Sequence, residues 1–205
     1  MKVLWLKRPF DLCLASFGLI LSFPLWLVFG LMIWISDGGP VFYLQERVGK
    51  GGKIFKAIKF RSMIKDAEKT AGPQQAAKDD PRVTKVGKYL RATAMDELPQ
   101  LINIIKGEMS FVGPRALRPQ EKEVVGNGEV VDLAHIPGYE ERHSVRPGLT
   151  GIAQISLPSD APRHEKFQYD LFYIEKKSFW LDLKLLLRSF WITFRAKWGS
   201  LDKKR

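Results

Sequence analysis

Residues 93–101 read Thr-Ala-Met-Asp-Glu-Leu-Pro-Gln-Leu and place two adjacent carboxylates, Asp96 and Glu97, directly before an amphipathic helix. The apolar residues of this helix recur every three or four positions, which is the spacing of one buried helical face: Leu98, Leu101, Ile102, Ile105 and Met109. Pro99 lacks an N–H and fits the first helical turn, where that donor has no partner. The carboxylates thus stand at the positive end of the helix dipole, which favours their ionised form and attracts phosphate or a metal–phosphate complex.

The same residues have a purely structural interpretation. Residues 93–96 have the spacing of a capping box, in which Asp96 would only satisfy backbone N–H groups at the start of the helix. The stretch alone favours this capping role, whereas the surrounding sequence favours a chemical one.

The composition predicts an anionic partner. The chain has 205 residues, of which 33 are lysine or arginine and 22 are acidic, so the formal net charge is +11. The length suits one domain, with room for an appendage, and the charge favours nucleic acid, a membrane surface or a phosphorylated substrate. The single cysteine, Cys13, excludes an internal disulfide, and the three histidines lack metal-ligand spacing, so no zinc site is predicted.

The tryptophans point to lipid at both ends of the chain. None of the six falls in the middle of the sequence: Trp5, Trp26, Trp34, Trp180, Trp191 and Trp198. Tryptophan concentrates at the membrane–water boundary. We therefore expect the two ends of the chain to contact lipid.

Residues 12–35 form an uncharged run long enough to cross a membrane. Roughly 24 helical residues span about 36 Å, against about 30 Å of hydrocarbon. The run is too long for a signal peptide, and no small-residue cleavage site follows it. Pro24 lies near its middle, close to Ser22, and would bend the helix. Both flanks are basic, which favours a helix that enters and leaves by the cytoplasmic face, with a kinked spanning helix as the alternative.

A small hairpin is predicted after this run. Residues 41–44 and 54–60 have the composition of short strands, and the glycines of residues 49–52 form the turn between them. The turn does not match a Walker motif, so an ordinary hairpin turn is favoured over a phosphate cradle. Lys59 and Arg61 would share one face of the extended chain, because alternate residues do. A solvated basic edge is the alternative.

A loop and a basic helix are predicted between the hairpin and the paired carboxylates. Residues 70–81 are polar and contain glycine and proline, which is typical of a mobile loop. Residues 83–92 are compatible with a short helix whose cationic stripe, ending at Arg91, leads directly to Asp96 and Glu97. Carboxylates flanked by cations suggest a site for a phosphorylated, metal-bound ligand.

Two glycine–proline turns each present an arginine. Residues 107–115 end at Arg115, and residues 145–154 contain Arg146 with the polar side chains of Thr150 and Gln154. Arginine is suited to bidentate contacts with phosphate oxygens. Each turn taken alone is also compatible with an ordinary surface loop.

Two helices are predicted at the end of the chain, over residues 163–177 and 179–198. The second is dense in phenylalanine, tryptophan and leucine, with basic residues between them. This pattern is typical of a helix that lies in the membrane interface. A core helix is the alternative.

Together, these motifs resemble the bacterial sugar transferases, also called monotopic phosphoglycosyl transferases, in a small form that is almost only the catalytic domain. The resemblance runs from about residue 6 to residue 195. It rests on five motifs in one order, at residues 46–49, 59–63, 90–91 with 96–101, 107–115 and 146–151.

The resemblance implies a mainly helical α+β fold in a monotopic membrane protein. Residues 1–36 would form a re-entrant helix broken at Ser22 and Pro24. Residues 37–205 would form a catalytic domain on the cytoplasmic face of the bacterial inner membrane, with a small β-hairpin and C-terminal interfacial helices. Membrane lipids would then be partners, together with a UDP-sugar and a polyprenyl phosphate such as undecaprenyl phosphate.

The resemblance also implies the chemistry. A sugar-1-phosphate would pass from the UDP-sugar to the polyprenyl phosphate with release of UMP, in the presence of Mg²⁺. We assign Asp96 as the nucleophile of an aspartyl-phosphosugar intermediate and as a metal ligand, and Glu97 to positioning or proton handling. The expected phosphate and nucleotide contacts are Lys59, Arg61, Arg91, Arg115, Arg146, Thr150 and Gln154.

The sequence departs from the family pattern in two places. Phe23 separates the usual Ser-Pro pair, and Ala94 replaces a small hydroxyl residue two positions before Asp96. Two other classes of protein fit part of the sequence. A nucleic-acid binder fits the charge but not the apolar run or the tryptophans, so nucleic acid is not expected as a partner, and a non-catalytic membrane scaffold gives Asp96 and Glu97 no role. The sequence leaves open the sugar, the pathway and whether the chain forms a homodimer.

Overall fold

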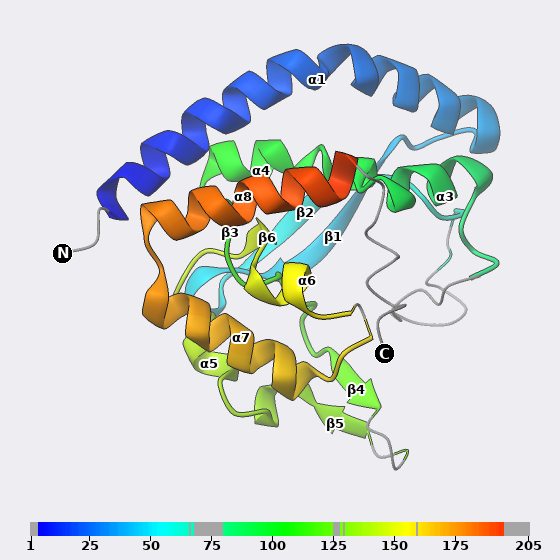
Figure 1. Cartoon of the computed structure of the whole chain (residues 1–205). Helices are drawn as coiled ribbons and strands as arrows, with labels where there is room; N and C mark the ends of the chain where they lie inside the picture. Colours follow the sequence, from blue (N-terminus) through cyan, green and yellow to red (C-terminus); the bar gives the residue numbers. More distant parts are fainter. Residues whose placement is uncertain are drawn as a thin grey trace.

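The computed structural model describes residues 4–65, 67, 80–124, 128, 130–158 and 160–194. A long helix, α1 (Lys7–Asp37), arches over a body of shorter helices and short strands (Figure 1). The predicted loop at residues 70–81 lies outside the described residues except for its last two positions. Residues 195–198, the end of the last predicted helix, also lie outside them.

The inner side of α1 packs against this body along its length. Ala15, which is fully buried, contacts the same core cluster as Leu101, and Phe29 and Ile33 pack in a second cluster with Phe60. Most of the outer side consists of exposed apolar side chains. Among the described helices, α1 alone has the length and apolar composition to cross a membrane.

Helix α1 continues through Pro24 as one curved element (Figure 1). The buried Ser22 hydroxyl accepts a hydrogen bond from Trp26 Nε1 at 3.1 Å, one turn further along. A proline removes one backbone donor, which bends a helix without necessarily ending it. The expected break at Ser22 and Pro24 is therefore not a gap in the secondary structure.

Both ends of α1 are tied to the same body. At the start, Lys7 Nζ lies 2.5 Å from Asp182 Oδ2, and the Arg8 guanidinium donates to the carbonyls of Ile104 and Ile105. At the other end, the buried Arg61 guanidinium lies 2.8 Å from Asp37 Oδ2.

The predicted hairpin is confirmed. Strands β1 (Phe42–Val48) and β2 (Ile54–Phe60) pair antiparallel, with Arg47 opposite Phe55 and Tyr43 opposite Lys59. The first strand is longer than predicted, and a short 3₁₀ turn, η2 (Lys50–Gly52), joins the two. Gly51 has a φ of 66°, a left-handed conformation that glycine adopts without strain.

The helix after the paired carboxylates is buried on two sides. Helix α3 (Lys85–Ala92) leads through η3 (Met95–Glu97) into α4 (Gln100–Lys106), which lies between α1 and the hairpin (Figure 1). The buried surface of α4 is wider than the predicted face, because Asn103 and Ile104 are also fully buried. The polar Asn103 side chain can be buried because its amide accepts from Ile58 N at 3.0 Å and donates to Lys56 O at 2.8 Å along the edge of β2.

The two arginine turns pack against each other. Strand β3 (Ser110–Val112) pairs in parallel with β6 (Gly148–Thr150). The glycines allow a close backbone approach, since a Cβ on Gly148 would lie 2.1 Å from the backbone nitrogen of Gly113. Further short elements are η1 (Leu4–Leu6), β4 (Lys122–Val124), β5 (Val130–Asp132), η4 (Leu133–His135), α5 (Tyr139–Arg142) and α6 (Ile152–Ser156).

The two predicted C-terminal helices are confirmed as α7 (Arg163–Lys176) and α8 (Phe179–Phe194). One side of α8 packs on β3, β6 and α6 through residues such as the buried Leu185. Its other side exposes large apolar side chains, with Trp180 76% exposed and Phe190 71% exposed. The helix therefore belongs partly to the core and partly to an apolar surface.

Candidate active site

The turn before Asp96 is made by the backbone of the preceding helix. The Thr93 hydroxyl donates to Tyr89 O at 2.9 Å, and Ala94 adopts a left-handed conformation with a φ of 56° that turns the chain into η3. No side chain caps η3 or α4. The capping-box interpretation of residues 93–96 is therefore wrong, because the threonine side chain is used by α3 instead.

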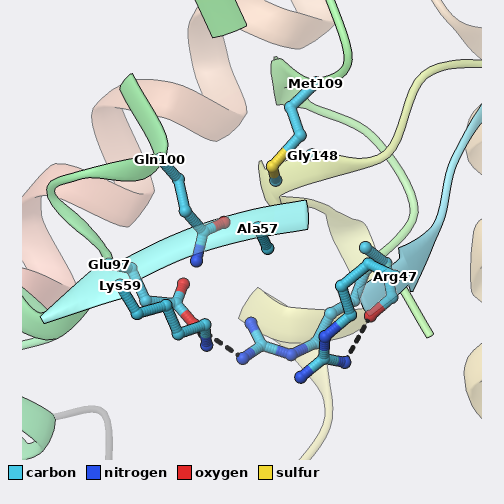
Figure 2. Close-up of a pocket in the computed structure, with 9 residues that line it drawn as sticks. Arg47, Ala57, Lys59, Glu97, Gln100, Met109 and Gly148 are labelled. Carbon is cyan, nitrogen blue, oxygen red and sulfur yellow. Dashed lines mark hydrogen bonds and ion pairs between the residues drawn. The ribbon is translucent and has the colours of Figure 1, made fainter. Parts of the chain in front are cut away.

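Glu97 is the centre of a compact charged cluster (Figure 2). Its Oε1 atom lies 2.8 Å from Lys59 Nζ and 2.8 Å from Arg115 Nη2. Lys59 comes from β2 and Arg115 from the segment after β3, so tertiary packing brings three distant parts of the chain together. Asp96 is partly buried beside this cluster and has no side-chain hydrogen bond among the described residues.

The two carboxyl groups titrate in opposite directions. Burial raises the pKa of Asp96 to about 6, against the attraction of Lys59, and the negative charge of Glu97 raises it further. Burial opposes ionisation of Glu97 as well, but the Arg115 and Lys59 cations prevail and hold the pKa of Glu97 well below its ordinary range. Glu97 is therefore a firmly ionised ion-pair partner, and Asp96 is a less stabilised carboxylate.

The two carboxyl groups also shift the pKa values of the neighbouring cations, Lys59 and Arg115. Burial lowers the pKa of Lys59, partly offset by the negative charge of Glu97. Glu97 raises the pKa of Arg115.

A pocket opens beside this cluster and encloses about 260 Å³, part of it continuous with solvent. It is lined by Arg47, Ala57, Lys59, Glu97, Gln100, Met109, Arg115, Ala116 and Gly148. Figure 2 shows Arg47 and Gln100 reaching into the same region as Glu97 and Lys59.

Arg47 and Gln100 are not among the site residues predicted from the sequence. Arg47 donates to Ala116 O at 2.8 Å, and burial, together with repulsion from Arg115 and Arg118, lowers the pKa of Arg47 to about 10. Gln100 is 4% exposed. No local pattern marks Arg47, because its place on the same strand face as Lys59 follows only from the pairing of β1 with β2.

Two of the predicted arginines lie elsewhere. Strand β2 ends at Phe60, and Arg61 turns to the end of α1, where it donates to Asp37 O at 3.2 Å. Arg146 Nε donates to Gly107 O at 2.7 Å, just after α4. Both arginines thus hold backbone carbonyls and do not line the pocket beside Glu97. Arg91 is nearer, because its positive charge lowers the pKa of Asp96 against the effect of burial.

Thr150 and Gln154 also lie outside the pocket. Thr150 is 3% exposed in β6, and its backbone carbonyl accepts from Gly113 N at 2.9 Å. The Thr150 hydroxyl and the Gln154 amide are buried without a hydrogen-bond partner among the described residues.

The residues present fit a magnesium ion that is shared with a substrate. The described residues contain no group of three or more metal-binding side chains. Magnesium is commonly held by one or two carboxylates together with substrate phosphates and water. Asp96 offers oxygens without hydrogen-bond partners among the described residues, whereas the Glu97 Oε1 atom is already paired twice.

Comparison with known proteins identifies close relatives. The bacterial sugar transferase family matches residues 2–196. A UDP-N-acetylgalactosamine-undecaprenyl-phosphate N-acetylgalactosaminephosphotransferase of Aeromonas hydrophila is 39% identical over 90% of this chain and 43% of the relative. A UDP-glucose:undecaprenyl-phosphate glucose-1-phosphate transferase of Klebsiella pneumoniae is 42% identical over 88% of this chain and 38% of the relative.

A shorter relative matches almost from end to end. The exopolysaccharide production protein PSS of Rhizobium leguminosarum bv. phaseoli is 38% identical over 88% of this chain and 91% of the relative. The chain therefore spans about two fifths of the first two relatives and nearly all of the third.

Proposed function

Because this chain belongs to the bacterial sugar transferase family, we propose that it transfers a sugar-1-phosphate from a UDP-sugar to a polyprenyl phosphate such as undecaprenyl phosphate. The products are a polyprenyl-diphosphate-sugar and UMP, which would make this the first membrane step of a bacterial glycoconjugate pathway. The observation that carries the proposal is the Asp96 carboxylate, unpaired among the described residues beside a Glu97 that holds Lys59 and Arg115. The relatives' names include both N-acetylgalactosamine and glucose, so the sugar is left unassigned.

The proposed chemistry has two displacements at one phosphorus atom. In the first, an oxygen of Asp96 attacks the phosphorus that carries the sugar, and the bond from this phosphorus to the bridging oxygen breaks. UMP leaves with that oxygen and the electron pair. In the second, an oxygen of the polyprenyl phosphate attacks the same phosphorus, and the bond to Asp96 breaks. Asp96 returns as a carboxylate, and no proton is consumed.

The charges beside Asp96 address the main obstacle, which is repulsion between a carboxylate and a diphosphate. Lys59 and Arg115 offset negative charge on the substrate, and Glu97 orients them. With a pKa of about 6, Asp96 is mostly ionised at neutral pH, yet it is not tied up in an ion pair. The depressed pKa of Glu97 makes it a poor proton acceptor, which supports positioning over proton handling.

Magnesium, when bound by Asp96 and the substrate phosphates, would neutralise part of the diphosphate charge.

The anchoring of α1 supports a re-entrant arrangement. Lys7 and Asp37, the first and last residues of α1, are both ion-paired to the folded body. A helix that is docked to one body at both ends does not carry one end across a bilayer. The exposed outer side of α1 and the apolar side of α8 would then face lipid, with the catalytic domain on the cytoplasmic face of the bacterial inner membrane.

The covalent step can be tested without the acceptor. Enzyme, Mg²⁺ and a panel of UDP-sugars, supplied without polyprenyl phosphate, should release about one UMP per active site with the correct donor. The peptide that contains Asp96 should gain the mass of one phosphosugar. UMP release that requires the acceptor, with an unlabelled peptide, would indicate direct transfer in a ternary complex. A protein with no UMP release under either condition would not be this enzyme.

A further inference from the structure

A second cationic pocket lies apart from the one beside Glu97. It encloses about 610 Å³, part of it continuous with solvent, and shares no lining residue with the first pocket. It is lined by Lys7, Lys50, Val112, Ser144, Val145, Arg146, Tyr173 and Lys177. Four of these residues are cationic and none is acidic. This pocket is where the structure places Arg146, which the sequence analysis assigned to phosphate binding.

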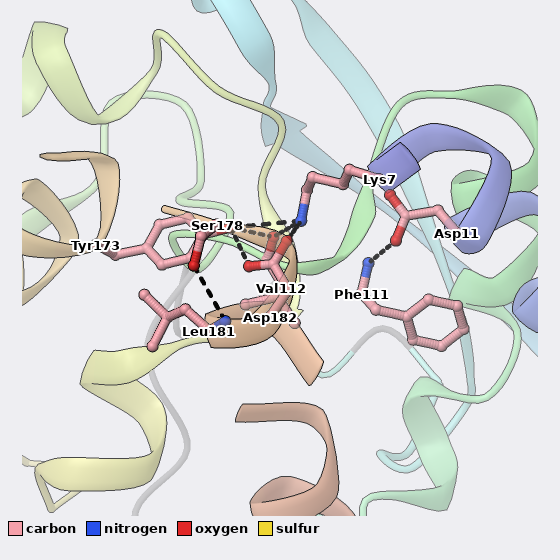
Figure 3. Close-up of polar contacts among 8 residues, drawn as sticks. All are labelled: Lys7, Asp11, Phe111, Val112, Tyr173, Ser178, Leu181 and Asp182. Carbon is pink, nitrogen blue, oxygen red and sulfur yellow. Dashed lines mark hydrogen bonds and ion pairs between the residues drawn. The ribbon is translucent and has the colours of Figure 1, made fainter. Parts of the chain in front are cut away.

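Three of the lining residues, Lys7, Val112 and Tyr173, belong to a polar network with Asp182 (Figure 3). Lys7 Nζ contacts Asp182 Oδ2 at 2.5 Å and Val112 O at 3.0 Å, and the Tyr173 hydroxyl donates to Asp182 Oδ1 at 2.8 Å. The charge of Lys7 is therefore largely matched by Asp182. The net positive charge of the pocket comes from the other three cations, Lys50, Arg146 and Lys177.

The fold brings together the three segments that carry these cations. The Gly51 N–H donates to His143 O at 2.8 Å, which sets the hairpin turn that carries Lys50 beside the segment after α5. Arg146 is anchored by its bond to Gly107 O. Lys177 caps the end of α7, at the corner where α8 begins. Three cations from three segments, converging without an acidic residue in the lining, match the chemistry that recognises a phosphate group.

The surroundings indicate where this phosphate comes from. Lys7 is the first residue of α1, whose outer side is apolar. Lys177 is three residues before Trp180, which is 76% exposed on the lipid-facing side proposed for α8. The pocket therefore lies at the level where an apolar surface gives way to a charged one, which is the depth of lipid head groups.

We propose that this pocket binds the phosphate group of an anionic phospholipid and thereby seats the domain on the membrane. The inference rests on the membrane orientation proposed above but not on the chemistry of Asp96. A phosphate group could also be supplied by a soluble molecule, and the experiment separates the two sources.

The test compares two double variants with the same charge. Lys50→Gln with Lys177→Gln removes two pocket cations. Lys53→Gln with Lys176→Gln removes two neighbouring lysines that do not line the pocket. The full chain is floated with phosphatidylcholine vesicles and with vesicles that contain about 30 mol% phosphatidylglycerol. The pocket variant should lose at least about fivefold of the preference for anionic vesicles, whereas the control variant should stay within about twofold of the unmodified chain.

Three outcomes would overturn the proposal. Equal losses in the two double variants would indicate diffuse attraction between a basic protein and an anionic surface. A preference retained in the pocket variant would show that the pocket has no role in lipid binding. Inorganic phosphate that abolishes the preference at constant ionic strength, at concentrations matched to the lipid phosphate, would identify the ligand as a soluble anion. Equal flotation of all three proteins on pure phosphatidylcholine is the control for folding, and UMP release tests the proposed reaction separately.

Discussion

Two lysine–carboxylate pairs in this protein are shielded to a similar degree but differ in their surroundings. The side chains of Lys7 and Asp182 are 24% and 7% exposed, and those of Lys59 and Glu97 are 15% and 16% exposed. Around Asp182, both carboxylate oxygens are engaged, by Lys7 and Tyr173. Beside Glu97, the Asp96 carboxylate has no hydrogen-bond partner among the described residues.

The difference teaches how to distinguish a structural ion pair from a chemical one. The two ion pairs are buried to a similar degree, so burial does not distinguish their roles. The hydrogen bonding of the neighbouring carboxylates does. Where both oxygens of a carboxylate are already paired, as in Asp182, the interactions stabilise the packing of the elements. That carboxylate then has no free oxygen for a ligand. Burial raises the pKa of a carboxyl group in both clusters, but Asp11, beside Lys7, is only 2% exposed, whereas Asp96 is partly exposed. An accessible carboxylate with a raised pKa is poised to bind or react, at a cost in stability.

Asp96→Asn should give the largest effect and sharpen this contrast. The variant loses the proposed nucleophile, so UMP release should fall by at least about 10³-fold. The free energy of unfolding of the variant should stay the same or increase. The pKa of Asp96 is raised from 3.8 to about 6, so the folded state binds this proton more tightly and stability falls as pH rises between these values. Removing the charge should recover on the order of 1–3 kcal/mol at neutral pH.

The measurements are the UMP assay and thermal unfolding in detergent. An inactive variant that also unfolds at lower temperature would place Asp96 in a structural network and contradict the contrast.

Asp182→Asn should lower stability and leave activity nearly unchanged, which is the opposite of the effect expected for Asp96→Asn. The change leaves the Lys7 ammonium without its charged partner and should destabilise the protein by about 2–4 kcal/mol. For a chain of this length, the melting temperature should fall by roughly 4–16 °C. The activity per folded molecule should change little. Replacing both partners, Lys7→Met with Asp182→Leu, removes the unmatched charge and should restore most of the loss, whereas a double variant as unstable as the single one would refute this account.

Glu97→Gln should have an intermediate effect on activity. Lys59 and Arg115 would lose the carboxylate that orients them, so kcat should fall by about 10–100-fold. The acceptor-free release of one UMP should persist at a lower rate, because Asp96 is still present. Steady-state and burst measurements separate the two effects. A burst lost as completely as in Asp96→Asn would make Glu97 part of the reacting pair.

The pH profile should show the smallest effect. The nucleophile must be ionised, so kcat/KM should be lost as pH falls through about 6, the pKa of Asp96. The rate at pH ~5 should be about one tenth of that at pH ~7. In Glu97→Gln this limb should move to lower pH, because the negative charge of Glu97 helps to raise the pKa of Asp96. An unchanged limb in that variant would show that another group controls the profile.

Local patterns in the sequence predict most of the secondary-structure elements, and its motifs identify the family. Strand β2, helix α7 and the start of α8 match the predicted bounds to within one residue, whereas β1 extends four residues beyond its predicted end. Their patterns of apolar residues, glycine and proline depend on neighbours a few positions away. The apolar run predicts α1. The sequence does not show that this helix packs along the folded body or that it continues through Pro24.

The cations that meet the carboxylates are evident only from the packing of distant segments. Lys59 and Arg115 converge on Glu97, whereas Arg61 and Arg146 turn to backbone carbonyls at the ends of α1 and α4. The physical reason is that a motif fixes the type of side chain, but its direction depends on where a strand ends and on which unpaired carbonyl lies within reach. The register of β1 and β2, likewise, places Arg47 on the same face as Lys59. No local pattern in the sequence contains that pairing.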